Sequence, residues 1–381
     1  MLFTREFIDV ENNAAGRVVG KAPREDGWDR TRELNTGRAN TTALRTIFDR
    51  ADANNRLIVY FPQGRYYLGL PQTALGPTES EQLADLVIPQ HVTLRLGPGA
   101  TLVPLAYSRA EALAARNMAW VGERERLLPE GERFRVRVEV QGAIDAPIAK
   151  IFDPFTDEDF DPTVMPTRPA GLVSFQRETV REVYPEWWGA IPMRGEDVEL
   201  TPAEVRRTTA ALQASIDAAF HHRVRMPNAA FEPTPPSRPS LPVVLTNNYL
   251  IDRPLRVGMT LAQAREQGTH TESYPPNQAG FVMRGECGPA SSRGAAMIKA
   301  SRMFQPEEAP ERLPLFGDSS SLITLRLTTG LSIEDVVFDA AGVAMRCATV
   351  MTFSSAHHHS FEGCEFRDAE HTLLHLGGEF P

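Results

Sequence analysis

The sequence predicts a mostly β fold: a solenoid of stacked strand coils, built from two tandem units that each begin with a short amphipathic helix. Three observations support this prediction. One long pattern occurs twice in the 381 residues, short hydrophobic strands follow each copy, and a smaller repeat of 28 residues occupies the C-terminal part. Repeats of this kind are typical of proteins in which each structural unit stacks on the next.

The longer repeat begins with a helical pattern. Residues 41–51 read TTALRTIFDRA and residues 209–219 read TAALQASIDAA, so that Thr41 matches Thr209 without a gap. In the first copy the apolar positions recur at the spacing of one helical stripe, namely Leu44, Ile47, Phe48 and Ala51. We expect Asn40 or Thr41 to cap this helix, and we expect each helix to lay one face on the strands that follow it.

Short strands follow both helices. In the first copy we expect strands at residues 57–61, 91–96, 100–104 and 134–140, where apolar residues alternate with polar ones or form short runs between turns. In the second copy we expect them near residues 249–251, 280–283 and 296–300. Glycine and proline separate these runs, as turns between strands require.

The smaller repeat fixes which residues point inward. Its four apolar positions recur 28 residues later: Leu331, Ile333, Val336 and Phe338 match His359, Phe361, Cys364 and Phe366. The pattern describes two short strands joined by a corner. A solenoid would place the inward residues of one coil directly above those of the coil below.

Composition limits the classes of function. Hydrophobic residues make up 42% of the chain, which allows a large core. A net charge of −9 argues against nucleic acid and anionic membranes as partners. The three cysteines form no disulfide or metal pattern, so we expect no cofactor and no metal. There is no apolar run of about 20 residues for a membrane helix and no secretory signal at the N-terminus. We therefore expect either a location in the cytoplasm or a place in a particle that leaves the cell without such a signal.

The repeats suggest four segments. Residues 1–39 are polar and are expected to form an N-terminal arm or attachment segment. Residues 40–182 form the first unit, residues 183–207 a junction that contains two adjacent tryptophans, and residues 208–381 the second unit. No obvious closing segment follows the last coil, so we expect either that the sequence is truncated at this end or that another domain or subunit covers its strand edges.

The helix TTALRTIFDRA, the strand segments VYFPQGRYYL and LVIPQHVTLRLGPGATL, and the junction VYPEWWGA resemble the entry segment of the pectate-lyase-like right-handed parallel β-helix superfamily. The resemblance is greatest to the N-terminal portion of phage tail-spike and bacterial surface proteins, and covers roughly residues 40–380. It implies a right-handed parallel β-helix. It also implies a homotrimer or an association with other particle subunits. The second copy departs from the pattern, because PNAAF stands where Pro-x-Gly-x-Tyr is expected.

The 28-residue register points to a candidate carboxylate pair. If Ile333 and Phe361 point inward, Glu334 and Glu362 point outward on adjacent strands. Adjacent strands lie about 4.8 Å apart, and a retaining glycosidase needs two carboxyl groups about 5–5.5 Å apart. Glu334 and Glu362 are therefore the candidate catalytic residues, although charged side chains are also common on any solvated sheet. Asp339 and Arg367 stack by the same rule and could form an ion pair beside them, as substrate-binding residues.

Aromatic and histidine clusters provide weaker candidates. Trp187 and Trp188 could stack on sugar rings as substrate-binding residues, or could pack as the hydrophobic plug of the junction. Residues 357–359 are three consecutive histidines, but neighbours on a strand face opposite sides. His359 falls on the inward register, where a hydrogen-bonded core histidine is expected.

Two classes of function remain open. The chain could recognise a polysaccharide, with or without cleaving it, in the manner of a tail spike or surface protein. It could instead be a non-catalytic structural or attachment part of a phage-like particle. A free-standing polysaccharide lyase or glycoside hydrolase is a further alternative. The sequence leaves open whether the protein is an enzyme.

Overall fold

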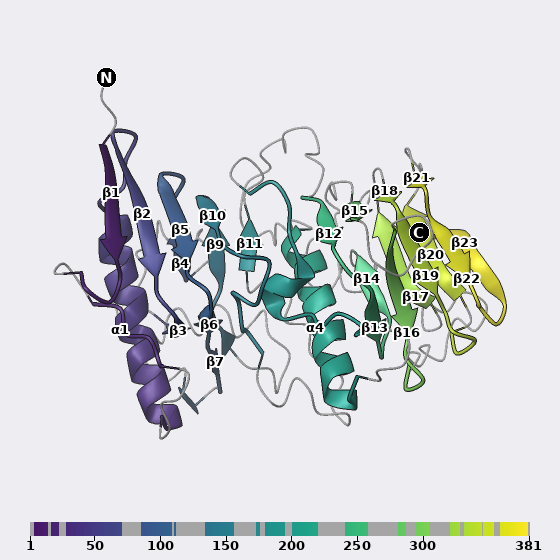
Figure 1. Ribbon diagram of the computed structural model, residues 1–381, viewed down its shortest axis with the longest axis horizontal. Helices are drawn as coiled ribbons and strands as arrows, with labels where there is room; N and C mark the ends of the chain where they lie inside the picture. Colours follow the sequence, from purple (N-terminus) through teal and green to yellow (C-terminus); the bar gives the residue numbers. More distant parts are fainter. Residues whose placement is uncertain are drawn as a thin grey trace. The chain divides into compact units, whose positions relative to one another are not determined.

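A computed structural model describes the chain from Thr4 to Glu379, except for residues 14–16, 23–27, 71–84, 109, 112–133, 156–172, 176–179, 195–199, 220–240, 258–280, 287–294, 305–320, 328–330, 345 and 354–358. The described part is mostly strand, as predicted, and its two α-helices begin the two copies of the long repeat (Figure 1). The chain divides into two compact units, residues 1–180 and 181–381. The junction with two tryptophans belongs to the second unit.

The first unit contains one helix and eleven strands within the described residues. The helix is α1 (Arg30–Phe48). The strands are β1 (Thr4–Asp9), β2 (Asn55–Phe61), β3 (Gly64–Leu68), β4 (Leu86–Ile88), β5 (Val92–Leu96), β6 (Ala100–Pro104), β7 (Ala106–Tyr107), β8 (Phe134–Arg135), β9 (Val138–Val140), β10 (Ala143–Asp145) and β11 (Val173–Phe175). The strand predicted at residues 134–140 is therefore two strands, β8 and β9, with a break between them.

Most strand pairs of the first unit are parallel. The sheet orders are β1-β2-β5-β10, β11-β9-β4 and β3-β6, and β7-β8 is the antiparallel pair of this part. Inward side chains such as Leu57, Val59 and Leu94 are buried, whereas the alternate positions point outward. This alternation is what the period of two in the sequence predicts.

The N-terminal segment differs from the predicted irregular arm. Residues 4–9 form β1, which pairs in parallel with β2 from Thr4↔Asn55 to Asp9↔Tyr60. The helix also begins about ten residues earlier than expected, at Arg30, because the side chain of Asp29 accepts the backbone N–H of Arg32 at 2.7 Å. Asn40 and Thr41, the predicted caps, lie inside the helix and are fully buried.

The second unit contains a 3-10 helix, one α-helix and twelve strands within the described residues. The helices are η2 (Pro185–Trp188) and α4 (Pro202–Ala219). The strands are β12 (Val243–Leu245), β13 (Tyr249–Ile251), β14 (Leu255–Val257), β15 (Phe281–Gly285), β16 (Ala296–Ala300), β17 (Ser321–Leu327), β18 (Leu331–Glu334), β19 (Val336–Asp339), β20 (Arg346–Phe353), β21 (His359–Glu362), β22 (Glu365–Arg367) and β23 (Thr372–Glu379).

The second helix begins with a capping box. Glu204 donates its backbone N–H to the hydroxyl of Thr201 at 3.3 Å, and the carboxylate of Glu204 accepts the backbone N–H of Thr201 at 2.8 Å. This reciprocal pair satisfies two backbone donors of the helix start, and Pro202 fills the first helical position. In Figure 1, α4 lies beside β13 and β14, and it contacts both strands through its buried face.

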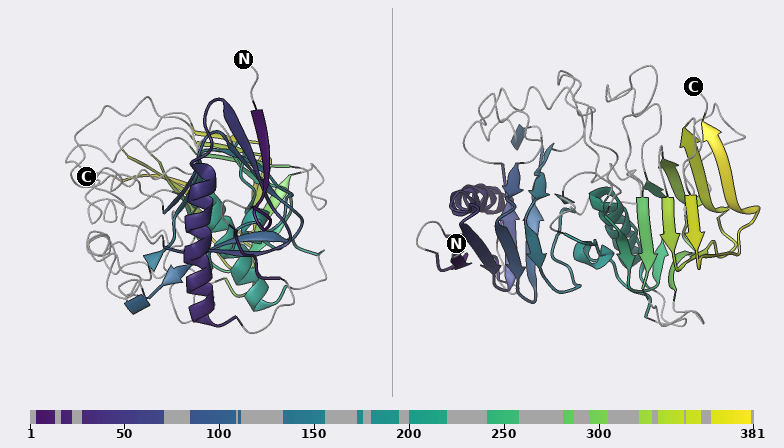
Figure 2. Two further views of the ribbon diagram at one scale, coloured as in Figure 1. Left: turned by 90° about the vertical axis from the view of Figure 1, so that its left-hand side faces the viewer. Right: turned by 90° about the horizontal axis from the view of Figure 1, so that it is seen from above.

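The strands of the second unit follow a regular order. Each of three parallel sheets takes every third strand, giving β12-β15-β18-β21, β13-β16-β19-β22 and β14-β17-β20-β23. Figure 2 shows these strands side by side in successive layers, coloured from green to yellow. Each group of three strands therefore forms one layer that pairs with the next along all three sheets.

The interior of the second unit is apolar and aligned from layer to layer. Ile333 and Phe338 are fully buried, and the rings of Phe338 and Phe366 stack with centroids 5.4 Å apart. In the last layer, β21 to β23, the inward residues His359, Phe361, Cys364 and Phe366 are only half-buried. The predicted inward positions are confirmed, with less burial where no further described strand covers them.

Candidate functional site

Glu334 and Glu362 lie next to each other on adjacent strands, as the repeat predicts. β18 and β21 pair in parallel with the register Ile333↔Phe361 and Glu334↔Glu362. Because alternate residues face opposite sides of a strand, both carboxylates are on the outer face while Ile333 and Phe361 face inward.

A corner directly after each glutamate fixes its place at the end of the strand. Asp335 has φ 54° and Gly363 has φ 65°, so both residues take the left-handed conformation at the same point of successive layers. The backbone N–H of Asp335 donates to the carbonyl of Glu362 at 2.8 Å. The stacked corners therefore hold the two glutamates in register.

The two carboxylates have different surroundings. Glu334 is half-buried and accepts the hydroxyl of Ser332 at 3.0 Å, whereas Glu362 is exposed. Ser332 itself pairs in register with the exposed Ser360. The outer face of β18 and β21 thus presents two rows, one of serine hydroxyls and one of carboxylates.

An arginine continues the carboxylate row on the preceding strand. Arg284 of β15 pairs in register with Glu334, and we call Arg284, Glu334 and Glu362 the charged row. The Arg284 guanidinium donates to Glu182 at 3.0 Å and to Glu286 at 2.9 Å. It therefore binds carboxylates from two separate segments of the chain.

A tyrosine adjoins this end of the row. The hydroxyl of Tyr184 donates to Glu182, and burial, followed by this hydrogen bond, raises the pKa of Tyr184. Tyr184 therefore stays neutral at ordinary pH and is a donor beside the arginine.

The chemistry of the charged row favours binding over acid catalysis. The strand spacing suits a glycosidase pair, but a general acid needs a carboxyl whose neutral form is favoured by an apolar pocket. Glu362 is exposed, and Glu334 is half-buried and accepts the hydroxyl of Ser332. The row is better suited to accept hydrogen bonds from hydroxyl groups.

Asp339 and Arg367 are register neighbours on β19 and β22, but the predicted ion pair is not formed. Asp339 instead pairs with Lys299, its register neighbour on the other side, at 3.2 Å and accepts the backbone N–H of Ala341 at 2.8 Å. Asp339 is also buried, with 4% of its surface exposed. Its carboxylate holds the next corner and is not available to a substrate, so its prediction as a binding residue was wrong. Arg367 lies 3.7 Å from Glu365 of its own strand.

The two tryptophans are packed, as the alternative of a hydrophobic plug predicts and unlike what sugar stacking requires. Trp187 is 6% exposed and Trp188 3% exposed, and the Trp187 ring lies against Tyr184 with centroids 5.4 Å apart. They are core residues at the start of the second unit, where their helix η2 packs against α4.

A buried carboxylate next to these tryptophans is absent from the sequence predictions. Glu186 is 7% exposed, and its Oε1 accepts hydrogen bonds from Thr246, Asn247 and Tyr249. Glu186 ties η2 to the segment between β12 and β13. The PEWW motif alone does not indicate that Glu186 is a buried hydrogen-bond acceptor, because its three partners lie about sixty residues later in the chain.

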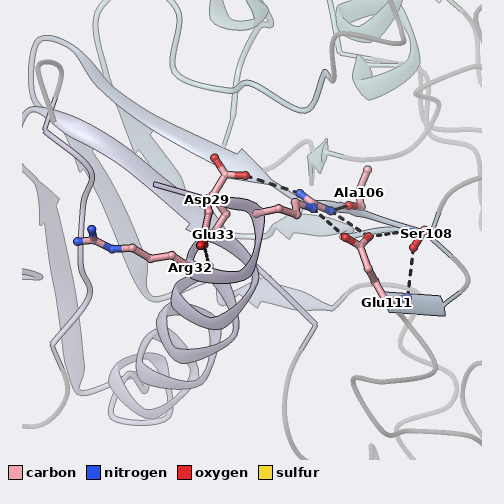
Figure 3. Close-up of polar contacts among 7 residues, drawn as sticks. Asp29, Arg32, Glu33, Ala106, Ser108 and Glu111 are labelled. Atoms are coloured by element: carbon pink, nitrogen blue, oxygen red, sulfur yellow. Dashed lines mark hydrogen bonds and ion pairs between the residues drawn. The ribbon is translucent and has the colours of Figure 1, made fainter. Parts of the chain in front are cut away.

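A polar network of the first unit has a similar anchoring role (Figure 3). Arg30 at the start of α1 donates to Glu111 at 3.0 and 3.3 Å and to the carbonyl of Ala106. Glu111 also accepts the backbone N–H of Ser108 at 2.7 Å. The hydrogen bond from Arg30 is the main cause of the lowered pKa of Glu111. These contacts attach the helix start to the segment after β7.

No metal centre is found in the described ranges, where no group of three or more histidine, cysteine or acidic side chains could hold an ion. Of the three consecutive histidines, residues 357 and 358 lie outside those ranges. His359 is inward-facing as predicted, but neither of its ring nitrogens has a hydrogen-bond partner in the described part. Burial lowers its pKa. The predicted inward position of His359 is therefore confirmed, whereas the prediction that His359 is hydrogen-bonded there was wrong.

Comparison with known proteins yields no relative. No protein-family model, curated protein or solved structure matches the chain. Of the helices within the described residues, none is both long enough and apolar enough to cross a membrane.

Proposed function

We propose that the chain is a right-handed parallel β-helix of the pectate-lyase-like type, and that the outer faces of its strands bind a polysaccharide. The β-helix proposal is supported by the order of the second unit, in which all three parallel sheets take every third strand. A chain that winds through three sheets in turn produces this order, whereas a sandwich of antiparallel strands does not.

The observation that carries the binding proposal is the pair of polar rows on β18 and β21. Ser332 aligns with Ser360, and Glu334 aligns with Glu362, so the same chemical groups recur from one strand to the next. A polysaccharide also repeats its hydroxyl groups along its length. Carboxylates accept strong hydrogen bonds from hydroxyls, and serine hydroxyls both donate and accept.

Binding without cleavage is the form of this function that the surroundings favour. Glu362 is exposed, whereas the general acid of a glycosidase is typically held in an apolar pocket. A chain of this kind would serve as the recognition part of a tail spike or surface protein, with a trimer or other particle subunits as partners. The trimer and the particle rest on the sequence resemblance alone.

The binding test uses neutral polysaccharides and a double variant. Affinity electrophoresis in gels that contain dextran, mannan, galactan or xylan should show retardation of the wild-type protein in at least one gel. Glu334→Gln combined with Glu362→Gln should weaken that binding about tenfold or more, because two charged acceptors are lost. Glu370→Gln is the matched control, because Glu370 is also exposed and lies outside the rows. Unchanged migration of the double variant in every gel that retards the wild type would refute the proposal.

The same samples test cleavage. We expect no new reducing ends from any of these polysaccharides. Release of reducing ends by the wild type and loss of that release in Glu334→Gln would instead establish the chain as a glycosidase that uses this pair.

A structural role is the second candidate, favoured by the ion pairs of Arg284 with Glu182 and Glu286. These contacts occupy one end of the charged row, as expected of a face that only holds the chain together. In that case no polysaccharide would retard the protein.

A further inference from the structure

An uncharged row of side chains crosses the outer face of the sheet β1-β2-β5-β10, whose strands lie side by side in Figure 1. Phe7 pairs in register with Ile58, Ile58 with Thr93, and Thr93 with Ala143, and we call these residues the neutral row. With adjacent strands about 4.8 Å apart, the row is about 14 Å long. Phe7 is exposed and the other members are half-buried, so the whole row is accessible from outside.

A hollow of about 370 Å³ lies over most of the neutral row. Its lining includes Ile58, Thr93 and Ala143, the members of the row on β2, β5 and β10. Arg56 and Arg95 also line the hollow. Arg56 precedes Ile58 by two residues on β2, and Arg95 follows Thr93 by two residues on β5, so they lie on opposite sides of the row. The hollow therefore has an uncharged floor between polar rims.

The charge of the Arg95 rim is balanced within the protein. The Nε of Arg95 donates to the carboxylate of Asp145 at 2.7 Å, and the two residues are register neighbours on β5 and β10. Their side chains are 46% and 55% exposed, so the ion pair is open to a ligand. A guanidinium group has five N–H donors, and a carboxylate accepts several hydrogen bonds. This rim therefore suits a ligand that has hydroxyl groups and no charge.

An exposed aromatic ring lies at the β1 end of the neutral row. Phe7 is 56% exposed, and its ring stacks on that of Tyr60 with centroids 5.8 Å apart. The stacking restrains the ring before any ligand binds, which lowers the entropy cost of packing against it. A sugar ring has an apolar C–H face edged by hydroxyl groups. An aromatic ring beside convergent polar groups is a suitable surface for such a ligand.

We propose that the neutral row is a second binding surface for an uncharged polysaccharide. One sugar ring packs on Phe7, and the adjoining rings occupy the hollow. Their hydroxyl groups hydrogen-bond to Thr93 and to the ion pair of Arg95 and Asp145. An extended neutral chain fits because the row is uncharged and longer than one sugar ring. The choice of a saccharide rests on the proposed function, but the surface lies in the first unit and shares no residue with the charged row.

Affinity electrophoresis of the full chain in gels that contain dextran, mannan, galactan or xylan tests this surface. Phe7→Ala should weaken binding about five- to tenfold in each gel that retards the wild type, because the stacking contact is lost. Ala143→Gln should weaken binding at least as much, because the longer side chain occupies the hollow. Ile148→Ala is the matched control, because Ile148 is a 52% exposed apolar residue of the same unit outside the row.

Salt distinguishes packing on an aromatic ring from attraction between charges. Interactions of exposed charges are largely screened at high ionic strength, whereas packing of a sugar on Phe7 is not. The ratio of wild-type to Phe7→Ala affinity should therefore be the same at about 0.05 M and about 0.5 M salt. Loss of the difference between the two proteins at the higher salt would overturn the assignment of a neutral ligand.

Folding and oligomeric state are checked on the same variants. Because Phe7 and Ala143 are accessible on the outer face, we expect thermal melting and size-exclusion chromatography to show little change from the wild type. If Phe7→Ala changes the oligomeric state and leaves polysaccharide binding unchanged, Phe7 belongs to a contact between copies of the chain, and the sugar surface is overturned.

The variants of the two units separate this surface from the charged row. Weaker binding by Phe7→Ala and Ala143→Gln, with unchanged binding by Glu334→Gln combined with Glu362→Gln, would support the neutral row and refute the role of the charged row. The opposite result would overturn the neutral row and leave the proposed function intact. Unchanged migration of the wild type in every gel would overturn both.

Discussion

Thr41 and Thr209 make the same pair of hydrogen bonds in the two copies of the repeat. The hydroxyl of Thr41 accepts the backbone N–H of Gly69 at 3.0 Å and donates to the carbonyl of Gly37 at 3.1 Å. The hydroxyl of Thr209 accepts the backbone N–H of Asp252 at 3.0 Å and donates to the carbonyl of Val205 at 3.0 Å. Each helix is thereby attached to the backbone just beyond a strand of its own unit.

Replacing either threonine by valine should destabilise the unit that contains it. Thr41→Val keeps the shape of the side chain but leaves the buried N–H of Gly69 without its acceptor, which costs about 1–3 kcal/mol. Thr209→Val should have an effect of the same size through Asp252. Urea unfolding followed by circular dichroism measures both losses. Thr42→Val is the control, because Thr42 is exposed and its hydroxyl donates within the helix, to the carbonyl of Arg38. A similar loss in the control would contradict the explanation.

The residues that precede these two threonines, Asn40 and Thr208, also bind the backbone at corresponding places in the two units. Asn40 accepts the backbone N–H of Val19 at 2.8 Å and donates to its carbonyl at 3.0 Å. Thr208 accepts the backbone N–H of Ile191 at 3.0 Å. Its single hydroxyl proton has two acceptors in reach, the carbonyl of Glu204 at 2.9 Å and that of Ile191 at 3.4 Å. The polar residues that suggested a helix cap from sequence are therefore used for long-range contacts. This use explains why the predicted start of the first helix was wrong.

Tyr249→Phe should destabilise the second unit. Tyr249 is fully buried, and its hydroxyl donates to the Oε1 of Glu186. Burial, together with the nearby Glu186, raises the pKa of Tyr249, so the hydroxyl keeps its proton and remains a donor. Loss of this donor to a buried carboxylate should cost about 1.5–3 kcal/mol. Chemical unfolding measures the loss, with Tyr60→Phe on the outer face of β2 as the control. Equal effects of the two substitutions would contradict a special role for Glu186.

The sequence predicts the fold best where the repeat is regular. Glu334 and Glu362 can be paired from the sequence alone, because a constant offset of 28 residues at four inward positions fixes the register. On its other side Glu334 has Arg284 as its register neighbour, fifty residues earlier in the sequence. Because this offset is not 28 residues, the repeat does not predict the pair.

The N-terminal strand shows a related limit. β1 pairs with β2 but lies in a segment whose composition indicates a polar arm. Residues 4–9 read TREFID, in which polar and apolar side chains do not alternate, so the period of two that identifies other strands is absent here. Asp339 shows a different limit. Its register neighbours on both sides are basic, and only the folded chain shows that Lys299 rather than Arg367 takes the ion pair.

Gly285→Ala should be strongly destabilising because the backbone corner at Asp335 leaves no room for a Cβ atom at position 285. A Cβ atom at this position would lie 1.9 Å from the carbonyl oxygen of Asp335 and 2.9 Å from the backbone nitrogen of Ala296. Relief of this clash requires a shift of the adjacent layer, at a cost of about 3 kcal/mol or more. Gly342→Ala is the control. It has φ +67° and no described atom within 4 Å of its Cβ, so it should cost only the backbone strain of about 1–2 kcal/mol. Thermal unfolding of the two variants should show the larger loss for Gly285→Ala, and the reverse order would show that the corners are not tightly stacked.

His359 should make stability depend on pH. Burial lowers the pKa of His359 in the folded state, whereas in the unfolded chain the pKa is about 6.5. Between these two values the unfolded chain binds a proton that the folded chain does not, so stability rises with pH through this window. The contribution is complete above about pH 6.5 and is lost as the pH falls toward the lowered value. His375 on β23, whose pKa is lowered by burial and by Arg346, acts in the same direction.

Replacing His359 by leucine isolates this effect. His359 faces Leu331 in register, and both of its ring nitrogens are buried without a hydrogen-bond partner in the described part. His359→Leu should therefore raise stability at neutral pH by about 1 kcal/mol and should reduce the loss of stability as the pH falls below about 6.5. Melting temperatures measured at intervals across this range test both effects, with the exposed His371→Gln as the control. If His359→Leu retains the full pH dependence of the wild type, the acid sensitivity arises at another group, and the inward register of His359 has no effect on stability.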